Sequence, residues 1–203
     1  AAPPQVGGRR GRAEPPAEGP ADVFLKAQAT ETEVWLRQPV LLTVTLYATR
    51  VDIRGLSWMG MPSRAGFWAE EVGTDPNAER TTAAVGGHTF NAYPVLRRLL
   101  VPTAPGDVVI DPFGAQLQLQ RSSGDLFEDF FSGGGSSLVV RRTDPLRLRV
   151  RPLPEAGKPA DFSGAVGNFK MRVSIDRTEA QVNDAIALKA VVEGDGSLQA
   201  APA

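Results

Sequence analysis

The residue types that carry most enzyme chemistry are almost absent from this sequence. It contains one histidine, His88, and no cysteine. A single histidine acts in catalysis only beside a positioned partner, and no serine lies in the glycine-flanked turn that presents a nucleophile. Without cysteine there is no disulfide, thiolate metal site or thiol nucleophile, and one histidine does not complete a zinc site. We therefore interpret His88, which follows Gly86-Gly87, as an ordinary turn or strand-end residue.

The run from Arg121 to Ser137 concentrates acidic, aromatic and flexible residues in one place. Its acids lack the alternating spacing and distal glutamate of a calcium-binding loop, so we do not favour a metal site there. Its glycines, Gly133 to Gly135, are followed by serines but by no lysine, so they do not form a phosphate-binding loop. The sequence therefore predicts no catalytic residue, no cofactor and no metal.

Two interpretations of this run stay open. Its apolar residues have the spacing of a single helical turn, and they either plug one end of a β-sandwich or stand exposed on a docking loop. In the second case the loop Ser122–Ser137 combines apolar anchors with an acidic rim, as protein contacts do. The partner-binding candidates are then Asp125, Phe127, Glu128, Asp129, Phe130 and Phe131.

The charge and hydropathy of the chain exclude several classes of partner. Its 203 residues carry a net charge of −1 with acids and bases interspersed, which argues against a nucleic-acid surface. No apolar run approaches the roughly 20 residues of a membrane-spanning helix, so we expect no direct membrane insertion. Hydrophobic residues make up 42%, which is enough for a core. Residues 1–21, rich in proline, glycine and alanine, are predicted to be a disordered tail or linker.

From residue 22 the sequence reads as many short strands separated by turns. Apolar–polar alternation predicts strands at Val23–Ala29 and Val40–Ala48. Further strands, set off by turns, are predicted at Phe67–Val72, Thr81–Val85, Thr89–Val101, Val108–Gln120 and Leu138–Val150. We expect the segment from Gly55 to Gly66 to be a turn-rich connection. With no convincing amphipathic helix, this pattern predicts one antiparallel β-sandwich over residues 22–152. Its interior is predicted to include Leu42, Val44, Leu46, Leu146 and Leu148.

The opening of this module recurs near the end of the chain. Thr32-Glu33 and Thr178-Glu179 lie 178 − 32 = 146 positions apart, and this offset superimposes the apolar positions of two strands. Two copies indicate tandem domains rather than a solenoid. We therefore predict an inter-domain hinge at residues 153–168 and the first strands of a second module at 169–203. In the hinge, we expect Phe162 to pack between the modules, while Gly164 and Gly167 free the backbone.

The hinge sequence resembles that of a known family. The run from Pro159 to Phe169, PADFSGAVGNF, is similar to the inter-domain signature of BatD-type proteins, the aerotolerance or oxygen tolerance family of bacteria. Three other stretches resemble that family: TVTLY at 43–47, DFFSGG at 129–134, and the DPL entry at 144–146 that leads to RPLP at 151–154. Together the resemblance covers residues 22–203.

This resemblance implies tandem immunoglobulin-like antiparallel β-sandwich modules, the second incomplete, with no catalytic residues. It also implies a position on the periplasmic, extracytoplasmic face of the inner membrane, anchored by a segment outside this chain. The implied partners are von Willebrand A-domain membrane proteins and a MoxR-type ATPase, in a system serving stress or oxygen tolerance. We expect the anchor and the export signal of such a protein to lie outside these residues. Two alternatives stay open: a cell-surface adhesion module, and a carbohydrate-binding module that uses Trp58 and Trp68.

Overall fold

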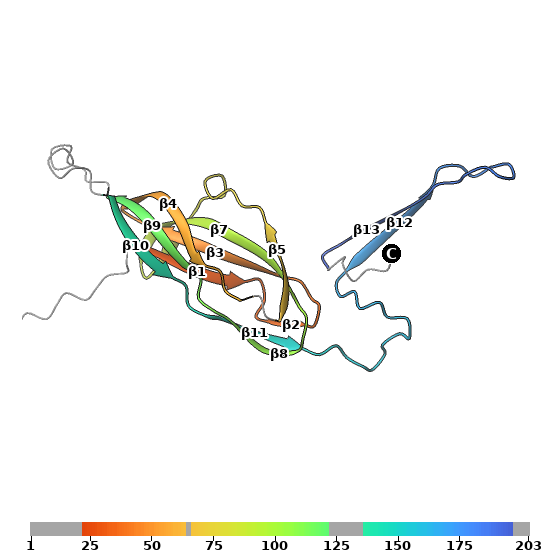
Figure 1. Cartoon of the computed structure of the whole chain (residues 1–203), viewed down its shortest axis with the longest axis horizontal. Helices are drawn as coiled ribbons and strands as arrows, with labels where there is room; N and C mark the ends of the chain where they lie inside the picture. The colour runs from red at the N-terminus through yellow and green to blue at the C-terminus, as the bar shows by residue number, and fades with distance from the viewer. Residues whose placement is uncertain (1–21, 64–65, 122–135, 197–203) are drawn as a thin grey trace, which may run out of the picture.

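The computed structural model describes residues 22–63, 66–121 and 136–196 (Figure 1). Every regular element in these residues is a β-strand, and among the strand pairings only that of β2 with β11 is parallel. The all-β, largely antiparallel fold predicted from the sequence is confirmed.

The described strands form four sheets. The first follows the order β1 (Val23–Ala29), β3 (Val40–Ala48), β7 (His88–Pro102) and β5 (Phe67–Val72), with β6 (Thr81–Val85) also paired to β7. The second has the order β10 (Ser136–Arg142), β9 (Gly114–Arg121) and β4 (Val51–Gly60). The third has the order β2 (Glu33–Trp35), β11 (Leu146–Arg151) and β8 (Gly106–Ile110). The fourth is the hairpin of β12 (Phe169–Ile175) and β13 (Leu188–Gly194).

The main core lies between the first and second sheets. Successive side chains of a strand point to opposite faces, and β3 accordingly alternates buried and half-buried positions from Val40 to Leu46. The predicted core residues Leu42, Val44, Leu46 and Leu148 are buried in this cluster, and Leu146 packs against it half-buried. They meet Ala115, Leu117 and Leu119 from β9. At one edge of the sandwich, Arg141 of β10 links the two sheets, since its Nε donates to the carbonyl of Val23 in β1 over 2.9 Å.

A proline in the central strand β7 is accommodated by a bulge. Val44 pairs with Leu96 while the next residue, Thr45, pairs with Pro94, so Val95 has no partner in β3. Because proline has no N–H to give to the ladder, it is tolerated in a sheet interior at such an irregularity.

Two strands that the sequence analysis predicted as continuous are each broken in two. Val108–Gln120 divides into parts of β8 and β9, and Leu138–Val150 into parts of β10 and β11. The breaks fall at Asp111-Pro112 and Asp144-Pro145, where the missing proline N–H interrupts both ladders. Each broken strand therefore contributes its two halves to different sheets.

Two further elements were not expected. The segment from Gly55 was predicted to be a connection, but β4 extends from Val51 to Gly60. Its register with β9 shifts between Ile53 and Gly55 and again between Trp58 and Gly60. Each shift interrupts the apolar–polar alternation by which a strand is recognised in a sequence. The three-residue strand β2 is too short for its period to stand out.

The β12–β13 hairpin repeats the β1–β3 hairpin in the same register. Val23 pairs with Ala48 and Phe169 with Gly194, and the remaining six pairs of each hairpin also correspond at an offset of 146. The flanking hydrogen bonds correspond too: Thr30 N–H to the Leu41 carbonyl at 3.0 Å, and Asp176 N–H to the Ala187 carbonyl at 3.1 Å. Figure 1 shows the second hairpin at the far end of the segment that follows β11.

Candidate functional site

The residues predicted to bind a partner lie outside the described part of the chain. They are Asp125, Phe127, Glu128, Asp129, Phe130 and Phe131. The strands on either side of this segment are antiparallel neighbours, with Gln120 of β9 opposite Ser136 of β10. The choice between a buried plug and a docking loop stays a prediction.

Among the predicted hinge residues, Gly164 has the most specific surroundings. It is buried, its φ is 91°, and a Cβ added to it would collide with the guanidinium of Arg37. Arg37 lies in the turn between β2 and β3, and its N–H donates to the carbonyl of Pro102 over 3.1 Å. Glycine is favoured at 164 by its left-handed backbone, whereas the flexible end of the Arg37 side chain can move away from a Cβ. The segment after β11 is therefore docked against the turn that precedes β3.

The other two hinge residues contact their own part of the chain. Gly167 has a φ of 145°, and a Cβ there would collide with the backbone of Gly196. Phe162 is half-buried; its N–H donates to the Pro159 carbonyl over 3.2 Å, and the Lys158 ammonium lies 6.0 Å from its ring centroid. The expected packing of Phe162 between two modules stays a prediction.

The other aromatic and histidine candidates do not converge. His88 is exposed at the start of β7, opposite Val85 across the glycine turn. Trp58 packs toward the main core, with its ring centroid 6.3 Å from that of Phe113. Trp68 lies between Phe67 and Ala69, which contact the core, so it points to the opposite face of the first sheet. The two tryptophans therefore do not form a row on one surface, as a glycan platform would need.

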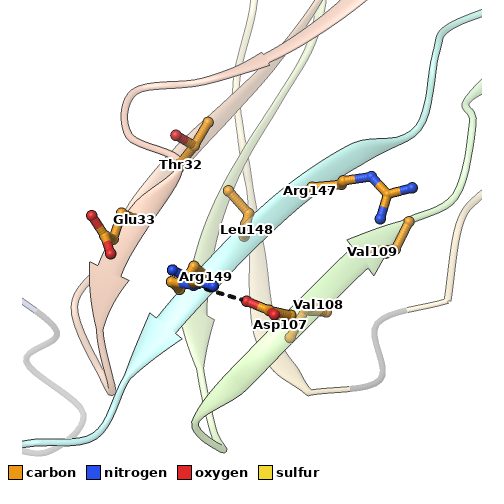
Figure 2. A pocket seen from close by; sticks show the side chains of 8 residues that line it. All are labelled: Thr32, Glu33, Asp107, Val108, Val109, Arg147, Leu148 and Arg149. Carbon is orange, nitrogen blue, oxygen red and sulfur yellow. Dashed lines mark hydrogen bonds and ion pairs between the residues drawn. The ribbon is translucent and has the colours of Figure 1, made fainter.

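A shallow depression of about 410 Å³ covers the outer side of the β2-β11-β8 sheet (Figure 2). Strand β11 reads LRLRVR, so Leu148 and Val150 are buried while Arg147, Arg149 and Arg151 are exposed on the other face. The residues that line the depression are Thr32, Glu33, Asp107, Val108, Val109, Arg147, Leu148 and Arg149.

Two of the three β11 arginines are neutralised by the flanking strands. Arg149 Nε donates to Asp107 Oδ1 over 3.1 Å, and this hydrogen bond, with the negative charges of Asp107 and Glu33, raises the pKa of Arg149 above its ordinary value. Arg151 Nε donates to Glu33 Oε1 over 2.8 Å. Both carboxylates of the depression are therefore paired with arginines.

The third arginine differs from its neighbours. Within the described residues Arg147 forms no ion pair, and its cross-strand partner is Val109, whose side chain is 48% exposed. Figure 2 shows the two side chains on adjacent strands at one end of the depression. An uncompensated cation beside an exposed aliphatic group is suited to a peptide segment that carries both a carboxylate and an apolar side chain.

A second concavity of about 470 Å³ lies between β4 and β7. Ile53, Leu56, Tyr93 and Val95 contribute half-buried apolar groups, and Asp52, Arg54 and Arg80 contribute polar ones. It lies beside residues 93–96 of β7, which pair with neither β5 nor β6. The bulges of β4 make its free edge irregular, which disfavours pairing with a further strand.

Neither concavity is lined by a histidine or a cysteine. Across the described ranges no cluster of three or more histidine, cysteine, aspartate or glutamate residues could hold a metal ion. None of these residues forms a helix that could cross a membrane. Sequence reasoning did not find the depression, because it treated β8–β9 and β10–β11 as two whole strands; the alternating arginines of LRLRVR were the available signal.

Comparison with known proteins adds no assignment, since no protein family and no curated protein matches this sequence.

Proposed function

We propose that this chain is a non-catalytic scaffold that binds proteins through immunoglobulin-like modules on the extracytoplasmic side of a bacterial inner membrane. Its resemblance to the BatD-type family suggests von Willebrand A-domain membrane proteins as the partners. A MoxR-type ATPase acts in the same system, which serves stress or oxygen tolerance.

The observation that carries this proposal is the repeated hairpin. All seven residue pairs of β12 and β13 correspond to those of β1 and β3 at one offset, although the paired side chains differ. A chain that repeats a unit with different surfaces is typical of proteins that span a distance and present several binding faces. The modular organisation therefore favours a scaffold over an enzyme.

The order of the strands supports the immunoglobulin-like part of the proposal. The path β1-β3-β7-β5, to which β6 is added beside β7, packs on the path β10-β9-β4. Without β6 this is the division into four and three strands that constant-type immunoglobulin sandwiches have. Strand β2 follows β1 in the chain but pairs in parallel with β11, so the N-terminal part of the module contributes to two sheets.

The depression on the β2-β11-β8 sheet supplies a contact surface for such a partner. Arg147 offers a charge that the described residues leave uncompensated, and Val109 offers apolar area beside it. We assign to the partner a carboxylate that meets Arg147 and an apolar side chain that covers Val109. A charge placed at the rim of a contact mainly affects the association rate and its dependence on salt.

The test is capture of membrane proteins from the source bacterium by the immobilised chain, followed by direct binding of each purified von Willebrand A domain. We expect a domain of that class to be retained. Arg147→Glu should then weaken its binding by about tenfold, mostly through slower association. Lys26→Glu makes the same charge change at an exposed position on β1, outside the depression, and should leave binding unchanged. Retention of no von Willebrand A domain would refute the proposed partner.

A further inference from the structure

The β12–β13 hairpin presents an apolar face that the described residues leave open. Met171, Val173, Ile175, Leu188 and Val192 all stand among the exposed large hydrophobic residues, and alternation places them on one side of the hairpin. Leu188 is 71% exposed and Met171 is 68% exposed. Isolated exposed apolar residues are ordinary, but a contiguous set on one sheet face marks an interaction surface.

The equivalent face of the first hairpin is buried. Leu42, the counterpart of Leu188, is 1% exposed, and Leu25, the counterpart of Met171, is 5% exposed. The two hairpins have the same backbone register, so the difference does not come from the hairpins themselves. It comes from what covers them.

In the first module the cover is a second sheet. The β10-β9-β4 sheet places Ala115, Leu117 and Leu119 of β9 in the same buried cluster as the β1 and β3 side chains. In addition, β7 pairs along the outer edge of β3 from Val40 to Ala48. The corresponding edge of β13 has no strand partner among the described residues, and its pairing with β12 contains no bulge.

The turn of the second hairpin also has the geometry of the first. Arg37 and Asn183, 146 positions apart, have φ values of 68° and 79°. The N–H of Gln38 donates to the carbonyl of Trp35 over 3.0 Å, and the N–H of Asp184 donates to that of Gln181 over 3.0 Å. A left-handed residue costs about 1–2 kcal/mol when it is not glycine, so its recurrence indicates that the whole opening unit of the module is repeated.

We propose that the open face of the β12–β13 hairpin docks a second sheet of the same kind as β10-β9-β4, carried in the same polypeptide. Its facing strand presents small and branched aliphatic residues at alternate positions, as β9 does with Ala115, Leu117 and Leu119. A further strand pairs antiparallel with β13, as β7 does with β3. This inference concerns the modular repeat and does not depend on which protein partner the chain binds.

The test supplies such a sheet from the chain itself. A copy of residues 50–151 is joined after Asp195, which is the counterpart of Thr49. The amides of β13 should then exchange at least about tenfold more slowly than in the 203-residue chain. Leu188→Asp should abolish this protection because it places a charge on the docking face. Lys189→Asp, on the opposite face, should preserve it.

A control chain shows that the appended strands can complete a module. In it, residues 169–195 are also replaced by a copy of residues 23–49, so that the second unit contains only sequence that forms the first sandwich. If this control protects its second hairpin and the test chain does not, the proposal is overturned. Light scattering on the 203-residue chain gives a further check. A dimer that already protects β13 would show that a second copy covers the face instead.

Discussion

Replacing Thr143 by valine tests how the two broken strands are held together. Thr143 is 3% exposed and lies at the break between β10 and β11. Its Oγ1 accepts a hydrogen bond from the N–H of Phe113 over 3.0 Å, and its own N–H donates to the Phe113 carbonyl over 3.0 Å. The hydroxyl of Thr143 therefore accepts the hydrogen bond of the Phe113 N–H, for which the interrupted ladder offers no backbone carbonyl.

Valine keeps the shape of threonine but removes the acceptor, so the Phe113 N–H stays buried without a partner. A buried donor left unpaired costs about 1–3 kcal/mol. We therefore expect Thr143→Val to lower the free energy of unfolding in urea by that amount, with an unchanged slope against denaturant. The fluorescence of Trp58, which packs against Phe113, provides a signal close to the break.

Two comparisons isolate the hydroxyl. Thr143→Ser keeps the acceptor and loses only a methyl group, so it should be less destabilising than the valine variant. Thr89→Val makes the same chemical change at an exposed position of β7 and should have little effect. A Thr143→Val protein as stable as the parent would refute the assignment of this hydrogen bond as the support of the paired breaks.

Three further outcomes are expected. Leu42→Ala, at a fully buried core position, should cost about 2–5 kcal/mol in chemical unfolding; a smaller loss would contradict its place in the core. Gly164→Ala should loosen the segment because alanine is strained at a φ of 91°; faster amide exchange at 162–166 with unchanged sandwich stability would show this, and unchanged exchange would contradict it. The hydrogen bonds from Asn168 lower the pKa of Asp195. Their stabilisation is therefore present above the ordinary carboxyl range and is lost as the pH falls through the lowered pKa; Asn168→Ala should raise that pKa in an NMR titration.

Clear local signals predicted four strands, β1, β3, β5 and β6, with the bounds that they have in the structure. β1 and β3 alternate apolar and polar residues, and β5 and β6 lie between turn residues. The buried positions of β3 followed from the same alternation.

The elements that were missed depend on interactions between distant segments. Taken alone, Asp111-Pro112 and Asp144-Pro145 look like turns or strand entries. The sandwich divides into separate sheets only because these two breaks lie opposite each other on neighbouring strands. The depression beside Arg147 arises from that division, since its three strands come from three distant parts of the chain. Pairing partners of this kind are not encoded in any one segment.

The side-chain volumes of the second hairpin support the inference that a sheet covers it. The pair Ala27–Val44 of the first hairpin becomes Val173–Ala190 in the second, so one small and one branched residue still share this face. A face in water needs no such balance, whereas close packing against another sheet does. The next pair, Ala29–Leu42, becomes Ile175–Leu188, which adds volume at one point. In the extended chain, Ile175→Ala should therefore increase the protection of β13, although it removes apolar surface; decreased protection would show that the face is not packed in this way.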